Sequence, residues 1–312
     1  MNNTCSHKVM SDLEFSLNFA DIGQVDLKTM LARYGIIHIR SVVSETNIRY
    51  FHKVISAALK SALKTNGITV PAAENDIDRL YNKLFSDASV TDFWKFAPKT
   101  LAKNTLVFHR LLCEPGIMKV AEELIGHDSF QLNWDQNLFR VDRPNEDFAA
   151  FEWHQDHPYI LLSKSAVSVW SPLTDVTREM GPLKFVPGSH QGQFHPIIIQ
   201  NTTSSENGNY QSKTSKHHYI TLADRADLEK KFDRDAMQLP MKAGDALFFH
   251  SHLVHRSGKN VSDRSRWVFV ARYGDLLDPE IVQRGWQSTR GANSKLVQEL
   301  YPDRVRVARE SD

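Results

Sequence analysis

Short strand-like segments dominate the chain after about residue 130 and limit the folds that it can adopt. Apolar or alternating runs are broken there by Pro, Gly and Asn: FQLNWDQNLFRV, AVSVWSPL, PLKFVPG, DALFFHSH and RWVFVARYG. Short strands at such close spacing are typical of a β-sandwich or barrel, and the lack of helical patterns between them argues against a parallel α/β sheet. We therefore expect a mainly β core, with a jelly-roll as its closed form.

The first third of the chain has a helical texture instead. Apolar residues recur at helical spacing from Ser44 to Leu63, where Ser44 is a suitable N-cap and Gly67 follows the predicted end. The run YGIIHIRSV before it predicts a strand. Residues 75–126 carry mostly helical patterns, including GIMKVAEELIG, which follows a proline. We expect a helix-rich N-terminal third whose helices pack outside the β core.

No internal repeat divides the sequence, so we treat residues 1–312 as one domain. The segment QNTTSSENGNYQSKTSKHHY is rich in Ser, Thr and Asn, and it predicts a polar surface excursion at about residues 200–235. Such an excursion is either an active-site lid or a solvated loop without function, and the sequence leaves both open.

Composition excludes several classes of function. The 38 basic and 37 acidic residues leave a net charge of +1, which gives no general attraction to nucleic acid or to a membrane surface. Cys5 and Cys113 alone cannot build a disulfide framework or a cysteine-rich zinc site. Without a secretory signal or a membrane-spanning run, we expect a cytoplasmic protein. Its expected partner is a small-molecule substrate, and its oligomeric state stays open.

The stretch FEWHQDHPYI gathers residues that bind metals. Because side chains alternate along a strand, His154 and Asp156 would share one face if this stretch is extended. A second strand folding back beside it would add His255, ninety-nine residues after Asp156. Two imidazoles and one carboxylate suit non-haem Fe(II) and leave three positions open. A His-x-Asp pair alone is weak evidence, and His250 and His252 compete with His255 as the third ligand.

The order of the later stretches adds to this pattern. GPLKFVPGSH and GDALFFH are followed by HRSGKN and by Arg266, eleven residues after His255. As a set they resemble the phytanoyl-CoA dioxygenase family of Fe(II)- and 2-oxoglutarate-dependent oxygenases, from about residue 34 to residue 275. The resemblance implies a double-stranded β-helix, the cupin-like form of the jelly-roll, with helices outside. It also implies that a dioxygenase hydroxylates an aliphatic carbon, with O2 as oxidant and 2-oxoglutarate decarboxylated to succinate.

The resemblance assigns roles to particular residues. It makes His154, Asp156 and His255 the iron ligands. It makes Arg266 the partner of the distal carboxylate of 2-oxoglutarate, with Ser257 donating to the same group. The chemistry agrees, because a guanidinium fork matches a carboxylate in two places and stays charged at any working pH.

Strand alternation also predicts where Arg266 points. In RSRWVFVARY, Arg266, Val268 and Val270 fall on one face, and Trp267 and Phe269 fall on the opposite face, where helices would cover them. Arg266 is therefore expected on the side of the iron ligands. A surface ion pair is the usual alternative for an arginine.

Other candidates for the site are less specific. Asn137 corresponds to a family amide near the keto-acid end of 2-oxoglutarate, although a shift of one residue would exchange it with Gln136. Trp170 resembles a tryptophan that flanks the cosubstrate, but large aromatic residues in strands more often belong to the core. Arg140 and Arg272 would meet an anionic substrate, or they are used in surface ion pairs.

Two other classes of function compete with a 2-oxoglutarate-dependent hydroxylase. A cupin-like metal enzyme that does not use 2-oxoglutarate gives no role to Arg266. A non-catalytic binding module should have lost an iron ligand. Retention of Asp156 argues against chlorination, because halogenating relatives replace this carboxylate with a small residue to admit chloride. Substrate identity, and hydroxylation against desaturation or ring closure, are not determined by the sequence.

Overall fold

The computed structural model describes residues 12–132, 136–146, 150–199, 225–288 and 295–307. Its main sheet has seven strands in the order β1-β2-β8-β5-β10-β3, and β4 also pairs with β10. Only the β1–β2 pairing in this sheet is parallel. The strands are β1 (Ser16–Asn18), β2 (Ile36–Arg40), β3 (Phe130–Leu132), β4 (Leu138–Asp142), β5 (Val167–Pro172), β8 (Ala246–His250) and β10 (Arg266–Asp275).

A second, smaller sheet closes the core. It consists of β6 (Lys184–Phe185) and β9 (His255–Arg256), which are antiparallel. Phe185 from this sheet packs in one apolar cluster with Trp170 and Val268 from the main sheet. The inner core therefore lies between a large and a small sheet, as a jelly-roll requires. A parallel pair, β7 (Ile197–Ile199) with β11 (Val305–Val307), lies apart from both.

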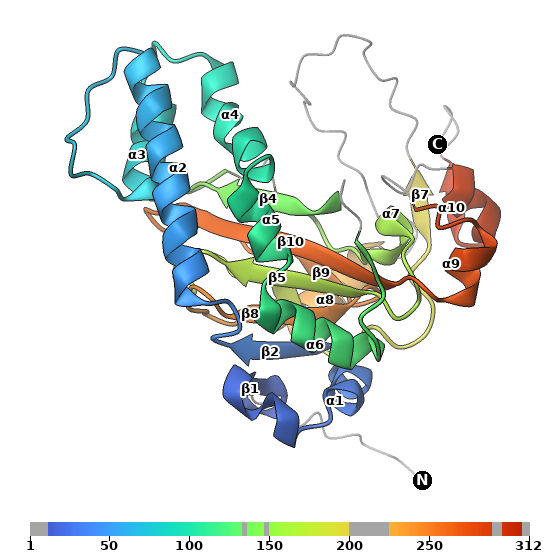
Figure 1. The fold of residues 1–312 in the computed structure, drawn as a ribbon. Coiled ribbons are helices and arrows are strands. Elements are labelled where there is room, and N and C mark those ends of the chain that lie inside the picture. Colours follow the sequence, from blue (N-terminus) through green and yellow to red (C-terminus); the bar gives the residue numbers. More distant parts are fainter. Residues whose placement is uncertain (1–11, 133–135, 147–149, 200–224, 289–294, 308–312) are drawn as a thin grey trace.

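Helices cover the outer face of the main sheet (Figure 1). They are α2 (Glu45–Thr65), α3 (Ile77–Ser86), α4 (Asp92–Lys103), α5 (Leu106–Leu112) and α6 (Pro115–Ile125). Trp267 of β10 packs against Tyr81 of α3, with ring centroids 5.4 Å apart, and Phe269 belongs to the same cluster. Because Val268 and Val270 belong instead to the inner cluster, the alternation predicted for β10 is confirmed.

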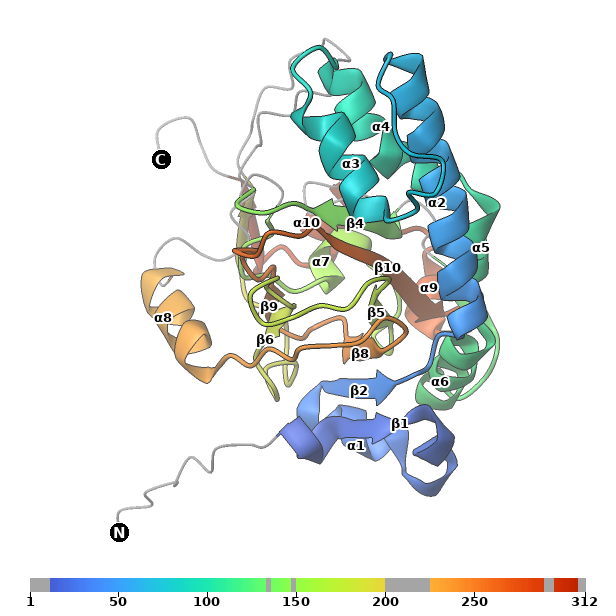
Figure 2. The ribbon, with the colours of Figure 1, turned by 90° about the vertical axis from the view of Figure 1, so that its left-hand side faces the viewer.

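The remaining helices lie around the rim and the opposite side. They are the 3-10 helices η1 (Asp12–Phe15) and η2 (Phe19–Gln24), and the α-helices α1 (Leu27–Tyr34), α7 (His157–Ile160), α8 (Arg225–Asp235), α9 (Pro279–Gln283) and α10 (Lys295–Leu300). Figure 2 separates α2, α5 and α6 on one side of the sheet from α8 on the other. Among the described residues, no helix is long and apolar enough to cross a bilayer.

The helix ends follow the sequence signals closely. The Ser44 hydroxyl accepts a hydrogen bond from the Asn47 amide at the start of α2, and Gly67 beyond its end has a φ of +73°. Helix α6 begins at Pro115 and stops at Gly126, whose φ is +108°. The mainly β core with helices outside and a helix-rich first third is confirmed.

The chain differs from the predicted pattern around His154, and part of the predicted polar excursion lies outside the described residues. The stretch FEWHQDHPYI is not a regular strand, because after His154 the chain turns into α7. The polar excursion at about 200–235 falls largely on residues 200–224, outside the described residues. Its last part is α8, where Phe232 is buried against Trp153.

Candidate metal centre

Two backbone hydrogen bonds bring the distant histidines together. His154 and His255 form an isolated antiparallel bridge in which each amide donates to the other's carbonyl over 2.9 Å. Their rings lie 4.2 Å apart. Asp156 then has helical backbone angles at the start of α7, where Pro158 occupies the first turn. The turn, rather than strand alternation, places one donor atom from each of His154, Asp156 and His255 within 4.8 Å of the others.

Both histidines are fixed in the tautomer that a metal needs. The His154 Nδ1 lies 2.7 Å from the Glu152 carbonyl oxygen, and the His255 Nδ1 lies 2.9 Å from that of Leu253. A carbonyl only accepts, so each Nδ1 carries the proton and each Nε2 carries the lone pair with which a histidine binds a metal. Burial lowers the pKa of His154 to about 3 and also lowers the pKa of His255, so both rings are neutral at neutral pH.

Asp156 supplies the negative charge. Burial alone would raise its pKa, but Arg272, His255 and His154 outweigh burial and hold the pKa well below its usual value. Arg272 donates to the carboxylate through Nε and Nη2, each over 3.1 Å. Ser168 donates to Oδ2 over 2.6 Å. The interpretation of Arg272 as part of a surface ion pair is therefore wrong, since its guanidinium is buried against Asp156, and its contact with an anionic substrate stays a prediction.

Arg266 points into the core as predicted, but it already holds a carboxylate. Its Nη2 and Nε lie 2.9 and 3.3 Å from Oδ2 of Asp142, and its Nη1 donates to the carbonyls of Met180 and Gly258. Arg140 donates to the other oxygen of Asp142 over 2.7 Å. Sequence reasoning missed Asp142, although β-sheet register places it directly opposite Arg266.

Ser257 and Trp170 border this arginine pair. Ser257 is buried, and its hydroxyl accepts from the Phe151 amide over 3.0 Å. The Phe151 ring lies 5.5 Å from the ring of His154 and 4.8 Å from the guanidinium of Arg140, so it connects the metal centre to the arginines. Trp170 belongs to the inner core, with the Arg266 guanidinium 6.0 Å from its ring.

Asn137 is fully buried just before β4. Its Oδ1 accepts from the backbone amide of Arg272 over 3.0 Å, which fixes the orientation of the side chain. Its Nδ2 finds no hydrogen-bond acceptor among the described residues. A buried amide donor without an acceptor is costly, so it is suited to an oxygen of a bound ligand. Gln136 contributes its carbonyl oxygen to Arg272 instead.

His250 and His252 do not join the metal centre. With His157 and His190 they form a separate histidine cluster, in which His250 lies 5.2 Å from His252 and 5.4 Å from His190, and His157 lies 4.6 Å from His252, between ring centroids. Among the described residues, only His154, Asp156 and His255 form a group with metal-binding geometry.

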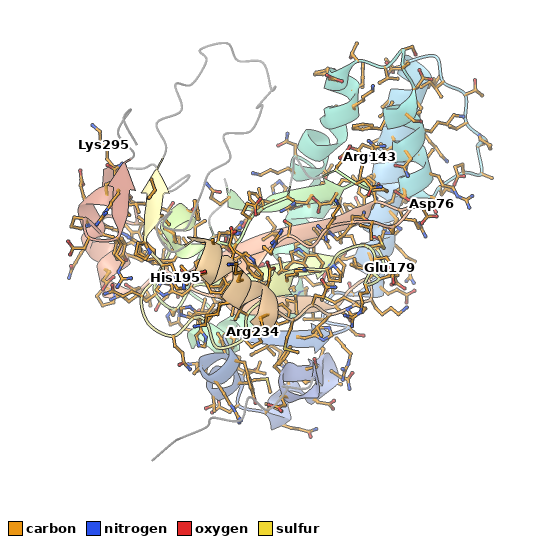
Figure 3. The ribbon with its side chains drawn as sticks, turned by 180° about the vertical axis from the view of Figure 1, so that it is seen from behind. Asp76, Arg143, Glu179, His195, Arg234 and Lys295 are labelled. Carbon is orange, nitrogen blue, oxygen red and sulfur yellow. The ribbon has the colours of Figure 1, made fainter. Side chains whose placement is uncertain are left out.

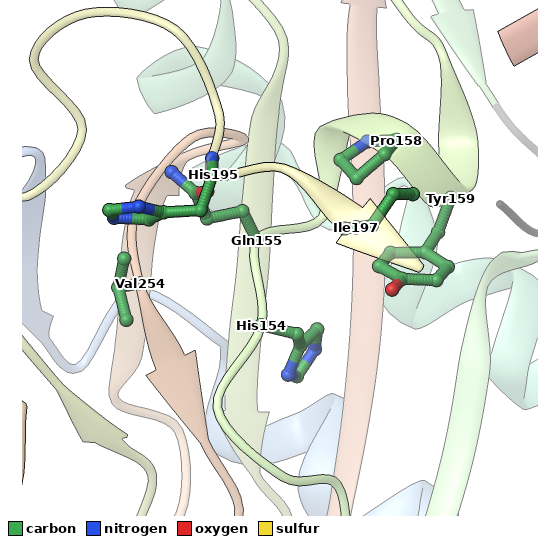
Figure 4. A pocket seen from close by; sticks show the side chains of 7 residues that line it. All are labelled: His154, Gln155, Pro158, Tyr159, His195, Ile197 and Val254. Carbon is green, nitrogen blue, oxygen red and sulfur yellow. The ribbon is translucent and has the colours of Figure 1, made fainter. Parts of the chain in front are cut away.

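A small pocket opens beside His154 (Figure 4). It is lined by His154, Gln155, Pro158, Tyr159, His195, Ile197 and Val254. His195 lies beside α8 (Figure 3), and burial lowers its pKa. The described lining therefore combines the apolar side chains of Pro158, Ile197 and Val254 with polar groups near the metal centre.

A statistical description of the phytanoyl-CoA dioxygenase family matches residues 31–268. The chain belongs to the phytanoyl-CoA dioxygenase family. This match confirms the resemblance seen in the sequence, and its range includes the HRSGKN stretch and Arg266.

Relatives of known name share moderate sequence identity with parts of the chain. It is 29% identical over 179 residues to L-proline trans-4-hydroxylase from Streptomyces griseoviridis, covering 54% of this chain and 63% of that relative. The matches to the first curated relatives each span less than two thirds of the relative's own length.

Two solved structures share the fold. One is EctD from S. alaskensis with 2-oxoglutarate and 5-hydroxyectoine, with a TM-score of 0.50 and 18% identity over 81% of this chain and 76% of that one. The other is the epimerase SnoN in complex with Fe3+, α-ketoglutarate and nogalamycin RO, with a TM-score of 0.50 and 18% identity over 89% and 90% of the two chains.

Proposed function

We propose that this protein is an Fe(II)- and 2-oxoglutarate-dependent dioxygenase that hydroxylates an aliphatic carbon of a small molecule. The observation that carries the proposal is the convergence of two neutral imidazoles and one ionised carboxylate within 4.8 Å. This ligand set is typical of non-haem Fe(II) oxygenases. Family membership over residues 31–268 supports the same chemistry.

The surroundings fit 2-oxoglutarate as well. Arg266 is buried on the face of β10 that points into the core, and a buried guanidinium is a suitable partner for a carboxylate. The unpartnered Nδ2 of Asn137 offers a donor near Arg272 and the metal centre. We assign the distal carboxylate to Arg266 and Arg140, with Ser257 beside them, and the keto-acid end to Asn137.

In the reaction, the protein orients the metal ligands and the substrate and excludes water. Iron with 2-oxoglutarate and O2 supplies the oxidising power, and 2-oxoglutarate ends as succinate. The backbone acceptors on Nδ1 orient the rings of His154 and His255, which would bind the metal through Nε2. Pro158, Ile197 and Val254 form an apolar surface beside His154. This surface would contact the substrate carbon and exclude water from the metal centre.

One observation favours a second candidate, a metal enzyme of the same fold that does not use 2-oxoglutarate. The donor fork of Arg266 is already bound to Asp142, so this arginine has an internal partner. If Arg266 serves only the fold, the distal carboxylate of 2-oxoglutarate loses its main proposed partner. The two candidates differ in whether Arg266 affects the binding of 2-oxoglutarate.

Calorimetric titration of 2-oxoglutarate into the Fe(II)-loaded protein under nitrogen separates them. Arg266→Ala should weaken the binding of 2-oxoglutarate by about 2–4 kcal/mol, the cost of a lost charge-assisted contact, while iron remains bound. The matched control is Arg284→Ala, because Arg284 donates to the carbonyls of Leu161 and Leu162 and, among the described residues, makes no hydrogen bond to the site. Equal 2-oxoglutarate affinity in wild type and Arg266→Ala would favour the second candidate.

The mass of the product shows whether the substrate is hydroxylated, chlorinated or desaturated. Similarity to L-proline trans-4-hydroxylase supports hydroxylation, and retention of Asp156 leaves no position for chloride. With substrate in a buffer that contains chloride, we expect a gain of one oxygen from O2, with succinate formed in step. Replacement of hydrogen by chlorine would contradict the assignment, and loss of two hydrogens would change only the outcome to desaturation or ring closure.

A further inference from the structure

A second inward-facing arginine on β10 lies at the metal end of the core. Arg272 follows Arg266 by six residues, so both fall on the same face of the strand. Across the sheet, Arg272 is directly opposite Ser168 of β5. Both side chains are buried and both donate to Asp156. Nothing in the reaction itself requires an arginine at this position, so its role must be sought in the carboxylate that it holds.

The two oxygens of Asp156 are not equivalent. Oδ2 accepts from Ser168 over 2.6 Å and from the Arg272 Nε over 3.1 Å. Among the described residues, the hydrogen bond that Oδ1 accepts comes from the Arg272 Nη2, over 3.1 Å. Because each carboxylate oxygen has about two lone-pair sites, Oδ2 is filled and Oδ1 retains one. Oδ1 is also the oxygen that lies 3.9 Å from the His154 Nε2, on the side of the metal centre.

Arg272 is itself held in place from a third direction. Its Nη1 donates to the carbonyl of Gln136, and its backbone amide donates to Asn137 Oδ1 over 3.0 Å. The guanidinium therefore cannot swing away from Asp156 without breaking contacts to the segment that leads into β4. A planar fork fixed at both ends is suited to holding a carboxylate in one orientation.

We propose that Arg272 and Ser168 are positioning residues that make Asp156 a one-oxygen ligand through Oδ1. This inference rests on the proposed function, because it concerns the same metal centre. Coordination by Oδ1 alone leaves three of six positions open, whereas coordination by both oxygens would close one of them. By holding Asp156 in this way, Arg272 and Ser168 leave coordination positions open for 2-oxoglutarate and O2.

Co(II) is a suitable probe, because its affinity is measured by calorimetry and its visible d–d bands weaken as the coordination number rises. The variants are Ser168→Ala, Ser168→Thr, which keeps the hydroxyl, and Arg272→Lys, which keeps the charge without the fork. Ser171→Ala is the matched control, because Ser171 is a fully buried serine of β5 whose hydroxyl donates to the Asp245 carbonyl over 2.7 Å.

We expect Ser168→Ala and Arg272→Lys to bind Co(II) about 10- to 100-fold more weakly than wild type, with altered d–d bands. Ser168→Thr and Ser171→Ala should keep both the affinity and the bands. Wild-type values for Ser168→Ala would overturn the inference, and so would equal losses in Ser171→Ala. If Arg272→Lys does not fold, Ser168→Ala decides alone. A wild-type protein that binds neither Co(II) nor Fe(II) would instead refute the proposed function.

Discussion

Asp142 joins two arginines inside the protein, and its energetic role is separate from that of the metal ligands. Burial would raise the pKa of Asp142, but Arg140 and Arg266 outweigh it and hold the pKa well below its usual value. Bringing such an ion pair out of water is costly, and removing one partner costs more, because the remaining charge stays buried. Asp142 therefore stabilises the arginines that the proposal assigns to 2-oxoglutarate.

Asp142→Asn should lower the free energy of unfolding by about 3–5 kcal/mol at neutral pH, measured by urea denaturation of the metal-free protein. Asp175→Asn is the control, since Asp175 pairs with Lys242 at the surface, where the two side chains are 56% and 80% exposed. Its change should stay within about 1 kcal/mol. Equally small changes in the free energy of unfolding of both variants would show that the ion pairs of Asp142 do not stabilise the fold.

Two glycines of the motif stretches, Gly181 and Gly258, bring separate elements together. Gly181 of GPLKF has a φ of +64°, and the backbone at residues 181–182 runs against the backbone at residues 258–259. A Cβ on Gly258 would overlap the carbonyl oxygen of Pro182. The carbonyl of Gly258 also accepts from Arg266. This close approach fixes the loop after β9 beside the proposed 2-oxoglutarate site.

Gly258→Ala should therefore lower the melting temperature and weaken the binding of 2-oxoglutarate together, because the loop must move to admit the methyl group. Gly23→Ala is a suitable control, since no atom lies within 4 Å of its added Cβ. Calorimetric melting and 2-oxoglutarate titration measure both effects. A Gly258→Ala protein with wild-type stability and affinity would mean that the loop tolerates displacement.

Elements defined by local signals were predictable from the sequence, and long-range pairings were not. The N-cap at Ser44 and the stop at Gly126 depend on neighbours in the chain, so the helices were found. The turn after His154 depends on its bridge to a residue about a hundred positions away, so the predicted strand was wrong. The partners of Arg266 and Arg272 depend on strand register, which periodicity alone does not give. That the whole chain forms one domain remains a prediction, as does its cytoplasmic location.

The histidine cluster connects distant parts of the whole molecule. His190 contacts the Ala32 carbonyl of α1, and His157 contacts the hydroxyl of Tyr301 after α10. Burial lowers the pKa of each member, and for His250 it does so to about 3. The unfolded chain, in which histidine titrates near pH 6.5, therefore binds more protons than the native protein below that pH.

The sign of this difference means that stability is fully present above about pH 6.5 and is lost as the pH falls toward the folded-state pKa. For His250, whose folded-state pKa is about 3, the slope in that window is about 1.4 kcal/mol per pH unit. Urea denaturation of the metal-free protein between about pH 4 and pH 6 should show a shallower slope for His250→Asn than for wild type. An unchanged slope would show that His250 is protonated in the folded protein.

The central claim is that iron and 2-oxoglutarate meet at His154, Asp156 and His255. Under nitrogen, Fe(II) chelated by 2-oxoglutarate gives a visible charge-transfer absorption that neither component gives alone. Titration of the wild-type protein should produce this absorption with an end point at one Fe(II) per chain. His255→Ala should abolish it, and His252→Ala should retain it, because His252 lies in the histidine cluster. An absent band in the wild type, or a band that survives His255→Ala and is lost in His252→Ala, would contradict the claim.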